Sequence, residues 1–191
     1  MCLRRVEEEY AGRVAFEWKS YLLRPAPRPP PGSEQRAAEQ LEKFRAYTQS
    51  WSGPASQPDS GEFRTWHSAA GPPSHSVPPH LVAKAAARCG EAAFEAIHER
   101  LLRAYFVDSR DITDWSTLKA VWLEADLAGE DFPDSEDPVL RQQIFDEHRE
   151  AVELGATGVP AIRRADDKLV IVGAHPVEMY RRWIDRSLSG D

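Results

Sequence analysis

Residues 155–164 read GATGVPAIRR, and this stretch decides the fold because it sets a proline, Pro160, directly before a strand-like run. Proline lacks a backbone N–H and fixes φ, so within a sheet it is tolerated only at an edge, at a first residue or at a bulge. The position of Pro160 therefore predicts either a strand that begins late or a peptide bond with a special role.

The residues around and after Pro160 form two short β-type runs, 158–164 and 168–173. The sequence ADDK lies between them and carries Asp166 and Asp167, which are typical of a hairpin turn. A closing helix is predicted over 176–188, where apolar residues recur at helical spacing. This end of the chain is expected to fold as strand, strand, helix.

The long middle of the chain, residues 78–154, shows the periodicity of successive amphipathic helices. Gly90 and Gly155 follow two of these helical runs, Asp111 or Thr113 is the expected cap of another, and the last helix is expected from about Asp137 to Leu154. We therefore predict an all-helical segment here.

Residues 24–32 read RPAPRPPPG, and five of these nine residues are proline. Such a run excludes a helix and favours a stiff, extended connector, with an SH3-type ligand as the functional alternative. A helix is expected over 34–51, followed by a turn-rich loop over 53–79 that Phe63 and Trp66 would anchor.

The N-terminal residues 2–10 carry Leu3, Val6 and Tyr10 at helical spacing. Residues 13–23 alternate apolar and polar side chains and are rich in aromatic residues, so they are predicted to form a strand. A helix that feeds directly into a strand is usually one half of a βαβ unit, which implies a strand before it.

The composition excludes several classes of protein. Acidic residues outnumber basic ones, 31 to 24, among 191 residues, which argues against a general nucleic-acid binder. No apolar run approaches the length of a membrane span, and no secretory signal is visible. The chain has two cysteines, Cys2 and Cys89, without a Cys-x-x-Cys motif, which favours a reducing compartment such as the cytoplasm.

The histidines do not predict a metal site. His67, His75 and His80 are close in sequence, but their spacing fits no standard pattern of ligands. His98, His148 and His175 lie among polar or capping positions and are expected at the surface. No resident metal or cofactor is therefore expected.

The segment GATGVPAIRRADDKLVIVGAHPVEMYRRWI resembles the closing unit of the DsbA family of thioredoxin-fold oxidoreductases. The stretch LLRAYF followed by RDITD resembles that family's helical insertion, and LRRVEEEYAGRVAFEWKSYLLRP resembles its first helix and following strand. The resemblance implies an α/β, thioredoxin-like fold with a large all-helical insertion. Residues 1–24 and 155–191 would be its two halves, 25–77 a connector and loop with one helix, and 78–154 the insertion.

The resemblance also implies a role for Pro160. In thioredoxin-like folds the matching proline follows a cis peptide bond and faces the catalytic dithiol, so Gly158, Val159 and Pro160 are expected to bind the substrate. An X–Pro bond can be held cis at modest cost. The Val159 backbone would then pair with an extended peptide.

The family's dithiol is a Cys-x-x-Cys at the start of the first helix, and this chain has none. By resemblance, the first strand and the motif would lie upstream of Met1, so the sequence looks N-terminally truncated. Either Met1 is an internal methionine of a longer product, or the protein has lost its redox chemistry. The first explanation is favoured, because the chain keeps apolar faces that a missing central strand would leave uncovered.

Neither cysteine is expected to replace the dithiol. Cys2 lacks a preceding turn that would place it at a helix end, so it is interpreted as a small helix residue rather than a nucleophile. Cys89 ends a helix, where the dipole disfavours a thiolate, and is interpreted as a buried structural residue. The sequence is also consistent with a disulfide between the two.

Three functions are consistent with these observations. The leading one is a cytoplasmic thiol–disulfide oxidoreductase that acts on a cysteine-containing protein or a small thiol. The alternatives are a glutathione-dependent transferase or isomerase of the kappa type, in which glutathione would be a substrate, and a redox-inactive module that binds peptides. The residues at the absent motif would discriminate between the first two.

Overall fold

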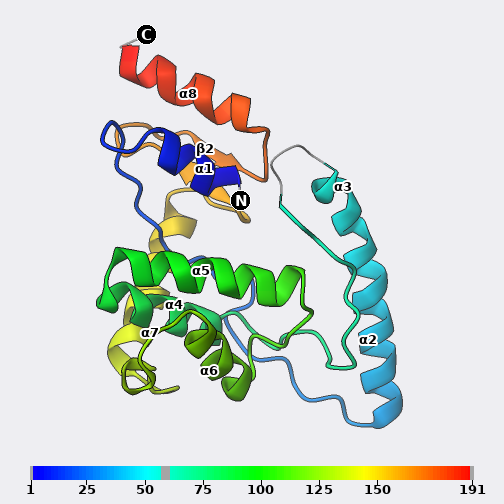
Figure 1. Ribbon diagram of the computed structural model, residues 1–191. Helices are drawn as coiled ribbons and strands as arrows, with labels where there is room; N and C mark the ends of the chain where they lie inside the picture. Colours follow the sequence, from blue (N-terminus) through cyan, green and yellow to red (C-terminus); the bar gives the residue numbers. More distant parts are fainter. Residues whose placement is uncertain (1, 57–60, 190–191) are drawn as a thin grey trace.

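A computed structural model describes residues 2–56 and 61–189 of the protein (Figure 1). The helices are α1 (Cys2–Glu9), α2 (Glu34–Thr48), α3 (Ser52–Ala55), α4 (Val77–Cys89), α5 (Glu91–Phe106), α6 (Trp115–Glu124), α7 (Pro138–Glu153) and α8 (Val177–Ser189), with short 3-10 helices η1 (Gln49–Trp51) and η2 (Gly129–Asp131). The strands are β1 (Ala161–Arg163) and β2 (Val170–Val172). The described chain is therefore mostly helical, with a small two-stranded sheet.

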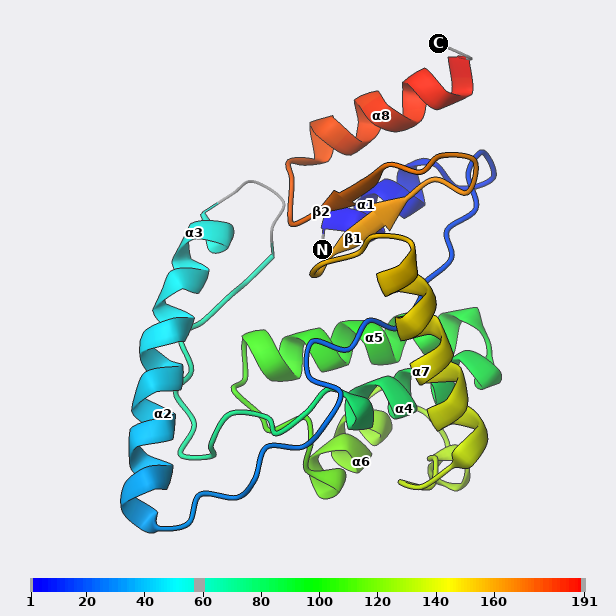
Figure 2. The same cartoon turned by 180° about the vertical axis from the view of Figure 1, so that it is seen from behind.

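The elements form two packed units and an arm, which is helix α2. Figures 1 and 2 show α1, the β1–β2 hairpin and α8 stacked above the helices α4 to α7, while α2 stands to one side. We call the first group the sheet unit and α4 to α7 the helical unit. None of the described helices combines the length and apolar character needed to cross a bilayer.

The helical unit is built around α4, which packs against α5, α6 and α7. Its core contains fully buried side chains from each of these helices, among them Val82, Ile97, Trp122 and Ile144. The indole N–H of Trp122 donates to the carbonyl of Ala128 at 2.8 Å, so the largest of these side chains is buried without an unsatisfied donor. The predicted helical segment is thus confirmed.

The caps of the helical unit agree only in part with the sequence. Helix α7 begins where it was expected, and Asp137 caps it by accepting from the N–H groups of Val139 and Leu140. Helix α6 is capped by Asp114, which accepts from Thr117 N–H. The prediction of Asp111 or Thr113 was wrong, because the Asp111 carboxylate instead accepts from Thr113 within the preceding turn.

The sheet unit has a smaller core of its own. Val6 of α1 and Tyr10, which directly follows that helix, pack against Val177 and Tyr180 of α8, with the hairpin against the same cluster. The Tyr10 hydroxyl donates to the Asp185 carboxylate at 2.8 Å and so joins the two helices. Burial, followed by that carboxylate, raises the pKa of Tyr10. The hairpin pairs antiparallel, with Ile162 opposite Ile171, as the sequence predicted.

Residues 13–23 correct the sequence analysis, because they are extended but belong to no strand. The predicted alternation is present: Val14, Phe16 and Trp18 are half-buried, while the residues between them are exposed. Within the described ranges, however, no strand pairs with this segment through backbone hydrogen bonds. Alternation predicts which face is buried, and a strand also requires a partner.

Side chains of the helical unit hydrogen-bond the backbone of this segment instead. Lys84 donates to the carbonyl of Trp18, and Glu147 accepts from Ser20 N–H. His148 Nδ1 accepts from Leu22 N–H at 3.2 Å. The extended segment therefore joins the two units through contacts with α4 and α7.

Candidate functional site

The candidate site lies where α7 ends and β1 begins. Helix α7 closes at Glu153, and Gly155 follows with φ of 99°, a left-handed conformation that favours glycine. The N–H of Gly155 donates to Val152, and the N–H of Ala156 to Ala151 at 2.9 Å, so the last carbonyls of the helix are paired. This turn directs the chain into the Gly158–Val159–Pro160 segment.

Pro160 directly precedes the first residue of β1, a place where a strand needs no N–H from it. The peptide bond between Val159 and Pro160 is cis. The Pro160 carbonyl accepts from Gly173 N–H at 2.8 Å, which adds one hydrogen bond to the hairpin just before the start of β1. The proline is thus anchored to β2 on one side.

Val159 is the exposed residue of the Gly158–Val159–Pro160 segment. Its exposed fraction is 47%, high for a valine beside a sheet. No residue in the described ranges hydrogen-bonds its N–H or C=O. The far edge of β1 also has no strand partner among residues 2–56 and 61–189. An unpaired backbone donor and acceptor in an exposed residue beside a free strand edge can pair with an extended peptide.

Gly158 is half-buried and lies against β2. A Cβ built on it would meet a methyl group of Val172 at 3.6 Å, an ordinary van der Waals distance. Space alone therefore does not require glycine here.

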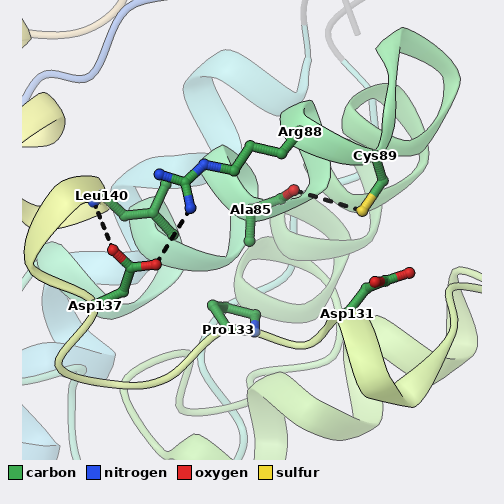
Figure 3. Close-up of a pocket in the computed structure, with 7 residues that line it drawn as sticks. All are labelled: Ala85, Arg88, Cys89, Asp131, Pro133, Asp137 and Leu140. Carbon is green, nitrogen blue, oxygen red and sulfur yellow. Dashed lines mark hydrogen bonds and ion pairs between the residues drawn. The ribbon is translucent and has the colours of Figure 1, made fainter.

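Cys89 is exposed, so the prediction that it is buried was wrong (Figure 3). The last turn of α4 extends past the core of the helical unit, and Ala87 and Arg88 are exposed with it. The Cys89 thiol donates to the Ala85 carbonyl at 3.6 Å, and it forms no disulfide. Partial burial of the sulfur and the nearby Asp131 raise the pKa of Cys89, which leaves little thiolate at neutral pH.

The position of Cys89 also separates it from Val159. Cys89 shares a cavity with Asp137, which caps the first turn of α7. Val159 follows the other end of that helix. Helix α7 has 16 residues and is about 24 Å long at 1.5 Å per residue. Cys89 is therefore not placed to act on a substrate bound at Val159.

Cys2 is the first residue of α1, and its side chain lies outside the described part of the structure. Its interpretation as a helix residue rather than a nucleophile remains a prediction.

A cluster that the sequence did not predict lies beside α1. The Arg4 guanidinium stacks between the rings of Trp18, at 4.9 Å, and Phe94, at 5.4 Å. It also forms ion pairs with Glu7 at 2.8 Å and Glu95 at 2.9 Å. These contacts join α1 to α5 across the extended segment.

His98 completes this cluster. Its ring stacks on Phe94 at 5.5 Å and meets Trp18 edge-on at 5.0 Å. Burial, then the charges of Arg4 and His80, lower the pKa of His98 to about 4. The prediction that His98 is a surface residue was therefore wrong. The i, i+4 spacing of Phe94 and His98 is the signal in the sequence that could have revealed the shared face.

The other two histidines expected at the surface are also half-buried. His148 accepts a backbone hydrogen bond from the extended segment, and the backbone of His175 donates to the Tyr180 hydroxyl. Within the described residues, no three His, Cys, Asp or Glu side chains are arranged to hold a metal ion.

The hairpin beside Pro160 and the helical unit that follows the extended segment define a thioredoxin-like fold with a helical insertion. The model of the DSBA-like thioredoxin domain family matches residues 1–185. The protein belongs to this family. A comparison with curated protein sequences gives no match.

Two solved structures show the same fold. One is a candidate protein disulfide isomerase from Nitrosomonas europaea, with a TM-score of 0.60 and 15% identity, covering 99% of this chain and 89% of that one. The other is the cytosolic disulfide reductase DsbM from Pseudomonas aeruginosa, with a TM-score of 0.59 and 20% identity, covering 100% of this chain and 91% of that one. At these identities the likeness concerns the fold.

Proposed function

We propose that the protein is a thiol–disulfide oxidoreductase of the DsbA type that binds an extended, cysteine-containing polypeptide at Gly158, Val159 and Pro160. One observation carries the binding site: Val159 is exposed, and its backbone donor and acceptor are unpaired within the described residues. Membership of the DSBA-like family supports the reaction class. The proposal needs no metal and no resident cofactor.

In this mechanism the substrate backbone pairs with Val159, which holds a substrate disulfide beside the sheet. A thiolate attacks one sulfur of that disulfide and forms a mixed disulfide, and the other sulfur leaves as a thiolate. A second thiol then attacks the mixed disulfide, so the substrate is reduced and the dithiol is oxidised.

The proposed reaction requires a dithiol. Cys89 lies near the far end of α7, and the sequence contains one other cysteine, Cys2. We propose that the exchanging pair is not formed by Cys2 and Cys89. Insulin reduction by residues 1–191 alone that is lost in the Cys2→Ser/Cys89→Ser variant would refute this, and an in-frame Cys-x-x-Cys encoded upstream of the Met1 codon would support it.

Substrate docking can be tested without the chemistry. The probe is an extended hexapeptide with S-methylcysteine at its centre, which can bind but cannot exchange disulfides. Val159→Pro removes the N–H donor, whereas the matched control Val159→Ala keeps the backbone and shortens the side chain. The loss of one hydrogen bond, about 1 kcal/mol, predicts roughly five-fold weaker binding for Val159→Pro. The affinity of Val159→Ala should change by less than about two-fold.

Equal affinities of the wild-type protein and Val159→Pro would refute docking at this residue. The two alternatives give different results in the same experiments. A redox-inactive module would bind the peptide but would not reduce insulin disulfides, even when the upstream segment is present. A kappa-type enzyme would bind glutathione in preference to the peptide.

We further propose that the protein acts in the cytoplasm. A chain with two cysteines suits a reducing compartment, and the structural neighbour DsbM is described as cytosolic. Fractionation of cells that express the full-length product tests this, and recovery outside the cytoplasm would contradict it.

A further inference from the structure

A second cavity lies on the arm, between the proline-rich connector, α2 and the loop at residues 69–74. Its volume is about 410 Å³, within the range of sites for small molecules. In Figures 1 and 2 the connector and the loop run between α2 and the helical unit. The lining residues include Pro30, Leu41 and Pro72, so much of the wall is apolar.

The walls of this cavity are held by hydrogen bonds. The N–H of Arg28 donates to the Ser74 carbonyl at 3.2 Å, and the N–H of Ser76 donates to the Arg24 carbonyl at 2.8 Å. On the other side, the Arg45 guanidinium donates to the Ser68 carbonyl at 2.8 Å, which ties α2 to the loop. The connector and the loop are therefore fixed relative to each other, and a ligand would meet a preformed site.

Arg28 is the single charged residue among those that line the cavity in the described structure. Within the described residues, its guanidinium forms no ion pair with a carboxylate. Burial and the like charge of Arg24 lower the pKa of Arg28, so its environment does not compensate the positive charge.

The cavity beside Cys89 provides a contrast within the same molecule. It also contains an arginine, Arg88, but Asp137 pairs with that guanidinium at 3.2 Å (Figure 3). In a protein with 31 acidic residues, an arginine in a lined cavity without a carboxylate partner is a distinctive feature. It marks the arm cavity, rather than the cavity beside Cys89, as a site for an anion.

We propose that the arm cavity binds a small carboxylate with an apolar body. The carboxylate would pair with the Arg28 guanidinium, which offers donors in a geometry that suits two carboxylate oxygens. The apolar body would lie against Pro30, Leu41 and Pro72, while Gln40 offers a further polar contact. This site is separate from Val159, and the proposal does not depend on the proposed oxidoreductase function.

The test uses octanoate as the probe and octanamide as its neutral counterpart, titrated into the ¹⁵N-labelled wild-type protein. Octanoate is expected to shift the amide signals of Ala37, Ala38 and Gly71 in a saturable manner. Octanamide should bind at least about ten-fold more weakly, because it cannot form the charged pair. This comparison uses the unmodified chain and therefore does not depend on the folding of a variant.

Two variants then test whether the Arg28 guanidinium supplies the positive charge that binds the carboxylate. Arg28→Gln keeps the backbone N–H that bonds Ser74 and is expected to weaken octanoate binding at least about ten-fold. Arg36→Gln removes an equal charge from an exposed residue of α2 that does not line the cavity, and it should leave the affinity unchanged. Equal binding of octanoate and octanamide, shifts confined to other residues, no saturable shift at all, or equal losses in both variants would each overturn the proposal.

Discussion

His98 makes the stability of the protein sensitive to acid. Its imidazole contacts the Trp18 and Phe94 rings, and the Arg4 guanidinium approaches its Nδ1 atom at 3.4 Å. A second half-buried histidine, His80, lies close enough to affect it. Burial and these positive neighbours oppose protonation, and they lower the pKa of His98 from 6.5 to about 4.

The direction and size of the effect follow from this difference. Below pH 6.5 the unfolded chain binds a proton at His98 that the folded protein does not bind, so the folded state loses stability as the pH falls. The loss continues until the folded pKa, about 4, is reached. A difference of this size corresponds to about 3 kcal/mol at 1.36 kcal/mol per pH unit. Burial, the largest cause, and nearby charges lower the pKa of His80 to about 4 as well, so the two histidines titrate as a coupled pair.

The measurement is urea unfolding, followed by tryptophan fluorescence, at a series of pH values between 7 and 4.5. We expect His98→Gln to reduce the slope of unfolding free energy against pH, whatever its effect on stability at pH 7. His67→Gln is the control, because its side chain is exposed. A slope for His98→Gln equal to that of the wild-type protein, or an NMR titration of His98 near pH 6.5, would refute the reasoning.

Two further substitutions test the junction and the core. Glu147→Gln should lower the free energy of unfolding by about 3 kcal/mol in urea titration, because Glu147 pairs with Lys84 at 2.7 Å where both side chains are largely buried. The double variant with Lys84→Met should lose less free energy of unfolding than the sum of the two single losses. An additive loss would contradict a coupled pair. Ile144→Ala should also lower the free energy of unfolding by about 3 kcal/mol, because Ile144 is fully buried in the helical unit. Val152→Ala, on the exposed side of α7, should lower it by under about 0.5 kcal/mol. Equal effects of these two variants would contradict the described core.

The hairpin and the helices could be predicted from the sequence because their signals are local. Turn residues at 165–168 and the short apolar runs beside them specify the β1–β2 pair, and Pro160 marks where β1 begins. The helices of residues 78–154 could be predicted because apolar residues recur at helical spacing within that segment itself. Each signal lies within a few residues of the structure that it predicts.

The strand predicted over 13–23 failed for the opposite reason. Its alternation correctly predicted the buried face, but strand formation depends on a partner backbone that the alternation does not specify. In the structure the partners are side chains more than 60 positions away in the sequence, such as Lys84 and Glu147. A single sequence contains no local pattern that predicts such contacts.

The candidate site also contains features that local sequence signals predict and features that distant contacts determine. Pro160 could be singled out because a proline before a strand is visible in the sequence, whereas the substrate-binding role of Val159 and Pro160 was inferred from the family resemblance and stays a prediction. The exposure of Cys89 and the burial of His98 depend on where a helix ends relative to the core and on which rings meet across two units. Tertiary contacts decide both, so residue type and position along a helix gave the wrong expectation.

Hydrogen exchange at the Val159 amide tests the central claim most directly. The wild-type protein is measured with and without the S-methylcysteine peptide, and exchange is followed residue by residue. If the peptide pairs with the free edge beside Pro160, the Val159 amide should exchange at least several-fold more slowly in the complex. Unchanged exchange at Val159, with protection on another surface of a saturated complex, would contradict the claim that substrates dock at this residue.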